Sequence, residues 1–255
     1  SLLNNEADLA VHSLKDLPIE DQKDTLIVSM LERADSRDIL FLKKDIFENY
    51  NNKELRILTS SPRRVYNFSN FLESLIPFNP SNITFEDVRG NIPTRLTKLL
   101  NGDCQGLIVA KAAIDRLIAY GNKDISAKIQ SYLDNLLWMI IPLSLNPCAP
   151  GQGAIAIEVN SKRRDIIELV DKINHNETFS QVAKEREILQ NYGGGCHQKI
   201  GVSIESKFFG QILTIKGQTE EGLENEKREV VNQITDWKNI PESNFFPSNL
   251  SKYKL

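Results

Sequence analysis

Short apolar segments that alternate with helical segments constrain the fold of this chain more than any other feature. Residues 55–58, 83–88 and 106–110 have the pattern of buried strands. A helical segment follows each of them, beginning near Pro62 in the first case and spanning 93–100 and 111–120 in the others. Such alternation implies right-handed crossovers and a mainly parallel sheet. The sequence therefore predicts an α/β fold.

The remaining segments extend this pattern on both sides. Further strands are expected at 8–12, 26–31, 39–42 and 154–159, an apolar run lies at 139–142, and helices are expected at 165–174 and 176–192. Residues 121–138 are interpreted as a polar, partly helical surface excursion. After the last helix, antiparallel strands are expected at 200–204, 211–216 and 228–234, with a charged turn at 220–227. No packed role is predicted for residues 237–255.

Composition excludes several classes of function. The net charge of −3 and the pI of about 5.8 argue against general nucleic-acid binding. No apolar run approaches the ~20 residues that a transmembrane helix needs. The three cysteines lie far apart, which favours reduced thiols and a cytoplasmic location. No Cys-x-x-Cys spacing occurs and the three histidines are scattered, so no metal site is expected.

Residues 193–196, Gly-Gly-Gly-Cys, form the most unusual local motif. Glycine adopts backbone angles that other residues avoid, so this run predicts an exposed, mobile loop that ends in the thiol of Cys196. The alternative is a helix C-cap followed by a buried cysteine, because the helix before Tyr192 needs a stop.

Charged residues follow the first expected strand. Lys15 and Asp16 come after the strand at 8–12, and the crevice beyond the carboxyl ends of strands is where α/β sheets bind ligands. The alternative is a solvated turn before Pro18.

A second charged group begins the helix at Pro62. Ser60 or Ser61 can cap this helix, whose N-terminus favours anions. Two arginines there, Arg63 and Arg64, are unfavourable for the helix dipole unless an anion sits between them.

Arginines recur near strand ends or in first helical turns. One arginine at such a position is more often a surface charge, but five predict a cleft for a ligand with several carboxylates or phosphates. The five are Arg63, Arg64, Arg89, Arg95 and Arg116. Residues 151–153, Gly-Gln-Gly, are interpreted as a hinge or tight turn where the chain crosses between domains, and Cys104 and Cys148 as structural.

Five motifs together resemble the porphobilinogen deaminase (hydroxymethylbilane synthase) family, and they occur in the family's order. They are DLAVHSLKDLP at 8–18, TSSPRR at 59–64, VRGNIPTRL at 88–96, APGQGA at 149–154 and GGC at 194–196. The resemblance runs from about residue 6 to about residue 216. It implies a transferase that condenses four porphobilinogen molecules into a linear tetrapyrrole, releasing ammonia at each step.

The resemblance also implies a dipyrromethane cofactor attached covalently through Cys196. It assigns Asp16 as the catalytic residue, and cofactor binding to Cys196 and Asp16 together with Lys15, Ser60, Ser61, Arg63, Arg64 and Arg95. Substrate, namely porphobilinogen and the growing pyrrole chain, would be bound by Arg89, Arg95 and Arg116. A cytoplasmic monomer without a metal ion is expected.

The family fold implied is three domains, two α/β domains like those of periplasmic binding proteins and a smaller α+β domain. The expected boundaries are 1–36 with 146–172, then 37–145, then 173–255. The family's N-terminal segment has no counterpart here, so we expect the first domain to lack its first elements. Two alternatives remain: a non-catalytic anion-binding module of two domains, or a truncated, inactive deaminase.

Overall fold

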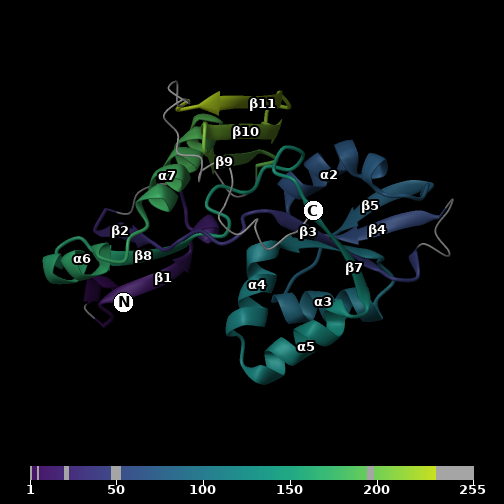
Figure 1. Ribbon diagram of the computed structural model, residues 1–255, viewed down its shortest axis with the longest axis horizontal. Coiled ribbons are helices and arrows are strands. Elements are labelled where there is room, and N and C mark those ends of the chain that lie inside the picture. The colour runs from purple at the N-terminus through teal and green to yellow at the C-terminus, as the bar shows by residue number, and fades with distance from the viewer. Residues whose placement is uncertain (1, 5, 20–22, 47–52, 194–197, 234–255) are drawn as a thin grey trace, which may run out of the picture.

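The structure, a computed structural model, describes residues 2–4, 6–19, 23–46, 53–193 and 198–233. Three β-sheets with helices packed around them make up this part of the chain, which confirms the α/β class (Figure 1). Among the described residues, no helix is both long enough and apolar enough to cross a membrane.

The largest sheet has the strand order β5-β4-β6-β3-β7. Its strands are β3 (Asp38–Lys43), β4 (Glu54–Leu58), β5 (Asn82–Glu86), β6 (Gly106–Ala110) and β7 (Leu136–Ile141). β4 runs parallel to β5 and β6, whereas β3 runs antiparallel to β6 and β7. All strands except β3 therefore point the same way, as predicted for a mainly parallel sheet.

Both faces of this sheet are covered, which explains its continuous apolar strands. In β3, Ile39 and Phe41 face the core under α3 (Ile92–Asn101), α4 (Lys111–Tyr120) and α5 (Lys123–Leu133). Leu40 and Leu42 face the opposite core, which contains Phe68, Phe71 and Leu72 of α2 (Pro62–Leu75). Successive side chains of a strand point to opposite faces, so one apolar run supplies two cores.

A three-stranded sheet has the order β1-β8-β2. Its strands are β1 (Leu9–Ser13), β2 (Thr25–Met30) and β8 (Ile155–Asn160), and β8 is antiparallel to both neighbours. The chain leaves this sheet for the larger one through residues 31–37, the first crossing, and returns through residues 142–154, the second crossing. In each sheet the strand opposed to the others, β3 or β8, is the one that follows a crossing.

The third sheet contains β9 (Gly201–Lys207), β10 (Gly210–Gln218) and β11 (Glu224–Val231), paired antiparallel with β10 in the middle. Helix α7 (Asn176–Asn191) lies between this sheet and the sheet of β1, β8 and β2 (Figure 1). Val182 of α7 packs against Met30 of β2 and Ala156 of β8, and Leu189 packs against β9 and β10. The short helix α6 (Arg164–Asp171) covers the other side of β8 through Val170.

Two segment predictions were wrong in part. Residues 220–227 are not all turn, because β11 begins at Glu224 and has charged side chains on an exposed edge strand. An edge strand needs only one partner, so it tolerates polar residues that hide it from pattern analysis. Residues 121–138 are not only a surface excursion, since Ile129 of α5 is fully buried and β7 begins at Leu136.

Candidate functional site

A buried carboxylate at the start of β3 organises the junction between the two crossings and α2. Asp38 is 1% exposed and accepts four hydrogen bonds from side chains. Arg63 Nη2 and Asn146 Nδ2 bind Oδ2 at 2.8 and 2.7 Å. Arg64 Nη2 and Gln152 Nε2 bind Oδ1 at 2.7 and 2.9 Å. Asp38 therefore joins the first turn of α2 to the second crossing.

The two arginines of α2 are buried rather than open to solvent. Arg63 also donates from Nη1 to Asn146 Oδ1 at 2.9 Å and to the Pro147 carbonyl at 2.8 Å. Arg64 donates from Nη1 to the Ile108 carbonyl at 3.3 Å. The Nε atoms of both arginines are buried without a hydrogen-bond partner. Guanidinium groups have five N–H donors, so both arginines keep donor capacity that the described protein does not use.

This arrangement answers the dipole problem posed by the sequence. An anion was predicted between Arg63 and Arg64, and the structure supplies one from the protein itself, the Asp38 carboxylate. Burial alone would raise the pKa of Asp38, but the charges of Arg64 and Arg63 hold it well below its usual range. One negative charge nevertheless faces two positive charges, so the junction retains an excess of positive charge.

Lys15 adds to this excess. It lies in the short 3₁₀ helix Leu14–Asp16 directly after β1, at the carboxyl end of the strand as predicted. Burial lowers the pKa of Lys15, and the nearby charge of Arg64 lowers it further, while Asp16 and Asp38 act in the opposite direction. Asp16 itself is exposed. Lys15 therefore lies near the arginines, whereas Asp16 keeps the solvent exposure of a turn.

The serines before α2 divide the roles predicted for them. Ser61 is the N-cap residue of α2, and its side chain accepts from the Arg64 backbone N–H at 3.4 Å. Ser60 instead connects two loops, because its Oγ donates to the Val88 carbonyl at 2.7 Å and accepts from the Val88 N–H at 2.9 Å. These two bonds place the loop that carries Arg89 beside the N-terminus of α2.

Arg95 continues the positive cluster along α3. Its Nε donates to the Gly90 carbonyl at 2.7 Å. Burial lowers the pKa of Arg95, and the charges of Arg64 and Arg89 lower it further. Arg89 is exposed. We use the name cationic cluster for Lys15, Arg63, Arg64, Arg89 and Arg95.

The remaining candidate arginine contacts the second crossing. Arg116 of α4 donates from Nη2 to the Gly153 carbonyl at 2.8 Å. Gly151 and Gly153 have φ angles of +75° and +87°, and a Cβ atom on Gly153 would lie 2.5 Å from the Ala34 carbonyl oxygen. Residues 151–153 thus form the predicted tight turn, in which the two crossings touch.

Cys196 lies outside the described residues, and so do its neighbours 194, 195 and 197. The chain on either side of them is described. Helix α7 ends before Gly193, whose φ is +97°, and Gln198 Nε2 donates to the Tyr192 carbonyl at 2.7 Å. Lys199 lines a pocket of about 370 Å³ together with Ser60 and Ser61. Residue 199, three positions after Cys196, therefore lies beside the N-terminus of α2.

A second buried carboxylate joins the crossings to α7. Glu185 is 0% exposed, and its two oxygens accept from Arg33 Nη1 and Nη2 at 2.7 and 2.9 Å. They also accept from the backbone N–H groups of Ile204 at 2.8 Å and Gly151 at 3.0 Å. Arg33 Nη2 lies 3.4 Å from Cys148 Sγ, and burial raises the pKa of the Cys148 thiol to about 12. Such a thiol stays protonated, in keeping with the structural role predicted for Cys148.

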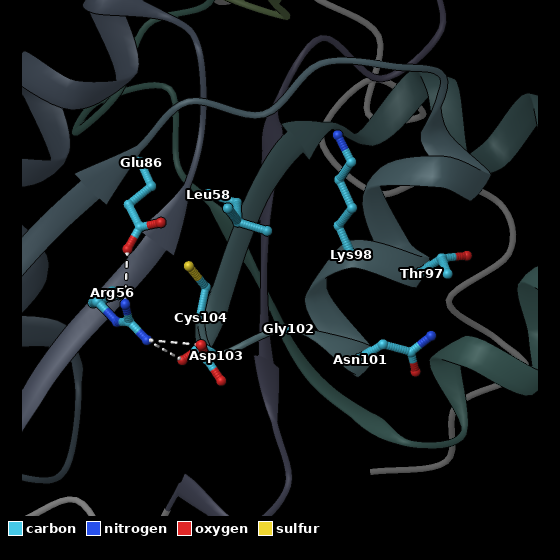
Figure 2. A pocket seen from close by; sticks show the side chains of 9 residues that line it. All are labelled: Arg56, Leu58, Glu86, Thr97, Lys98, Asn101, Gly102, Asp103 and Cys104. Atoms are coloured by element: carbon cyan, nitrogen blue, oxygen red, sulfur yellow. Dashed lines mark hydrogen bonds and ion pairs between the residues drawn. The ribbon is translucent and has the colours of Figure 1, made fainter.

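Another pocket, of about 440 Å³, lies at the C-terminal end of α3 (Figure 2). Its lining contains none of the candidate residues. Figure 2 shows Arg56 beside Glu86 and Asp103, at 3.3 and 4.0 Å. Burial raises the pKa of Cys104 in this pocket to about 11. Because its arginine is paired, this pocket lacks the excess positive charge of the cationic cluster.

Asp38, Asn146 and Gln152 were not recognised as site residues from the sequence. Asp38 directly precedes the strand expected at 39–42, and its partners lie 25 to 114 positions away. The only local signal was indirect, namely the need for an anion beside two arginines in a first helical turn.

Comparison with known proteins assigns the family. A family model described as porphobilinogen deaminase, dipyrromethane cofactor binding domain, matches residues 1–168. The chain belongs to the porphobilinogen deaminase family. The deaminase of Syntrophomonas wolfei is 36% identical over 220 residues, and that of Caldicellulosiruptor saccharolyticus is 33% identical over 249 residues. These matches cover 85% and 95% of this chain.

The family relatives are longer than this chain. The matches span 63% of the Syntrophomonas wolfei protein and 78% of the Caldicellulosiruptor saccharolyticus protein. Among solved structures, an arginine periplasmic binding protein from Legionella pneumophila aligns over 75% of this chain and 74% of its own, with 18% identity and a TM-score of 0.31. A TM-score this low adds nothing to the assignment.

Proposed function

We propose that this chain performs the reaction for which its family is named. The protein would condense four porphobilinogen molecules into hydroxymethylbilane, a linear tetrapyrrole, and release ammonia at each step. The observation that carries this proposal is the cationic cluster at the carboxyl end of β1, inside the segment matched by the cofactor-domain model. Every pyrrole unit has an acetate and a propionate group, so the growing product is a polyanion that such a cluster binds.

The residues fit a dipyrromethane cofactor. Bound through the sulfur of Cys196, this group supplies the primer on which pyrrole units are added. Its carboxylates would lie beside the positively charged guanidinium groups of Arg63 and Arg64 and the ammonium of Lys15. Ser60, Ser61 and Arg95 would line the same region, while Arg89, Arg95 and Arg116 would bind the incoming substrate.

Asp16 would act at the reacting atoms. Positive charge develops on the pyrrole when ammonia leaves, and a carboxylate nearby stabilises that charge and can accept a proton. The exposed position of Asp16 after β1, next to the partly buried Lys15, leaves its carboxylate accessible to a ligand. We further propose that the protein is cytoplasmic and monomeric, and that its domains divide at residues 36/37, 145/146 and 172/173.

The intact mass of the purified, denatured protein tests this function. We expect an excess equal to two porphobilinogen units less two ammonia molecules, and its loss in Cys196→Ser. Cys148→Ser is the matched control, because the Cys148 thiol is buried and protonated and should not carry the group. A bare polypeptide mass that stays bare after incubation with porphobilinogen and preformed tetrapyrrole would refute the proposal and favour a non-catalytic anion-binding module.

A further inference from the structure

Asp38 contacts both buried arginines and the two amide side chains, of Asn146 and Gln152, that lie beside them. Its Oδ2 binds Arg63 and Asn146, and Asn146 Oδ1 in turn accepts from Arg63 Nη1 at 2.9 Å. Its Oδ1 binds Arg64 and Gln152, and Gln152 Nε2 also donates to the Ser36 carbonyl at 2.6 Å. One carboxylate thus holds two guanidinium groups and both crossings at once.

The electrostatic effect of Asp38 on an anionic ligand opposes its geometric effect. A negative charge beside the arginines repels an incoming carboxylate and offsets part of the positive potential. The hydrogen bonds from the same carboxylate, however, keep each guanidinium in one orientation, and preorganised donors bind an anion without a further ordering cost. These two effects predict opposite signs for the removal of the charge, so an experiment can separate them.

We infer that Asp38 is a positioning residue for carboxylate binding, which sets the orientation of Arg63 and Arg64 from the two crossings. The inference rests on the proposed function, in which these arginines bind carboxylates. Asn146 and Gln152 share the task, since each is at most 1% exposed and bonded to Asp38. Asp38 itself does not touch the ligand.

Calorimetric titration with citrate, a tricarboxylate, tests the inference at constant ionic strength. All citrate measurements use the Cys196→Ser background, because a covalent cofactor attached there would occupy the arginines. In Asp38→Asn we expect the dissociation constant for citrate to rise about tenfold, although the site gains one positive charge. An unchanged or lower dissociation constant would overturn the inference, because Asp38 would then only compensate charge. Failure of the Cys196→Ser protein that keeps Asp38 to bind citrate would overturn it as well.

A second variant keeps the test decisive if Asp38→Asn does not fold. Gln152→Met is nearly equal in size and removes the hydrogen bonds to Asp38 and Ser36, and the one accepted from Arg64 Nη2 at 3.5 Å, without changing the charge. We expect it to weaken citrate binding about threefold, and unchanged binding would overturn the inference. Glu185→Gln is the control for loss of a buried ion pair, and an equal weakening there would show that the effect is not specific to Asp38.

The Cys196 mass measurement separates this inference from the proposed function. Weaker citrate binding in Asp38→Asn, together with a bare polypeptide mass after incubation, would refute the deaminase reaction and leave the positioning role standing. A cofactor mass in the wild-type protein, together with unchanged citrate binding in both variants, would support the proposed function and refute the positioning role of Asp38.

Discussion

The junctions at Asp38 and Glu185 use the same chemistry and differ in charge balance. Both carboxylates are nearly inaccessible, and both bind guanidinium groups and the second crossing. Glu185 faces the single charge of Arg33, and backbone N–H groups complete its shell. Asp38 faces two arginines, with Lys15 nearby.

The pKa shifts of the surrounding cations report this difference. Burial alone would lower the pKa of Arg33, but the charge of Glu185 more than offsets it and raises the pKa above its usual value. Around Asp38, burial and the neighbouring charge of Arg64 lower the pKa of both Lys15 and Arg95. The ion pair at Glu185 is balanced in charge and stabilises the fold, whereas the cations around Asp38 outnumber its single negative charge and favour an anion.

The largest expected effect on stability comes from breaking the buried ion pair between Glu185 and Arg33. Glu185→Gln leaves the Arg33 charge buried without its partner, and we expect a loss of about 3–5 kcal/mol in the free energy of unfolding. Urea denaturation measures this loss, and Glu187→Gln, at an exposed position of the same helix, is the control. Should Glu185→Gln prove as stable as the wild type, Glu185 could not be a structural junction.

The next prediction concerns the pH dependence of stability that Lys15 of the cationic cluster produces. Because the pKa of folded Lys15 lies below 10.5, the unfolded chain binds more protons between the folded pKa and 10.5. Stability contributed by this group therefore rises with pH across that window, by at most about 1.4 kcal/mol per pH unit. The difference between wild type and Lys15→Met, measured by denaturation at several pH values, isolates the slope.

Arg63, Arg64, Asp16 and Asp38 are the charged groups that act on Lys15. A bound carboxylate adds negative charge and raises the pKa of Lys15, so citrate should reduce the slope. A slope of the opposite sign would mean that Lys15 is not crowded by positive charge.

A smaller effect on stability is expected at Cys148, whose sulfur lies beside Arg33. Cys148→Ala removes a buried thiol that contacts Arg33 and the Val202 carbonyl, and we expect a loss of about 1 kcal/mol in the free energy of unfolding. Citrate binding should not change. Cys104→Ala is the matched control, a buried thiol in a different core. Weaker citrate binding in Cys148→Ala alone would mean that the two junctions are not independent.

The smallest expected effect is that of Arg95→Gln on stability, which changes sign when citrate is bound. Arg95 is repelled by Arg64 and Arg89, so Arg95→Gln should stabilise the ligand-free protein by about 0.5 kcal/mol. With saturating citrate the same variant should be less stable than the wild type, because one carboxylate partner is lost. Thermal unfolding with and without citrate measures both values, and destabilisation in both states would contradict the assignment of Arg95 to the cluster.

Much of this architecture was predictable because its signals are local. The alternation of strands and helices, the cap at Ser61 with Pro62, and the turn at 151–153 all depend on residues close in sequence. Asp38 could not be recognised, because its partners Asn146 and Gln152 lie 108 and 114 positions away. The exposed edge strand β11 was predicted to begin at residue 228 instead of 224 for a different reason, since its charged first residues lack the apolar pattern on which strand prediction depends.

The contact between the two crossings has a practical consequence for dividing this protein. Gly153 leaves no room for a side chain beside Ala34, and Gln152 binds Ser36 and Asp38 across the same gap. The two crossings, residues 31–37 and 142–154, are therefore held together as one unit. Expression of residues 37–145 alone would omit Asn146 and Gln152, leaving Asp38 with only its arginines. Fragment complementation should accordingly succeed only with cuts made outside both crossings, for instance in the turn between β10 and β11.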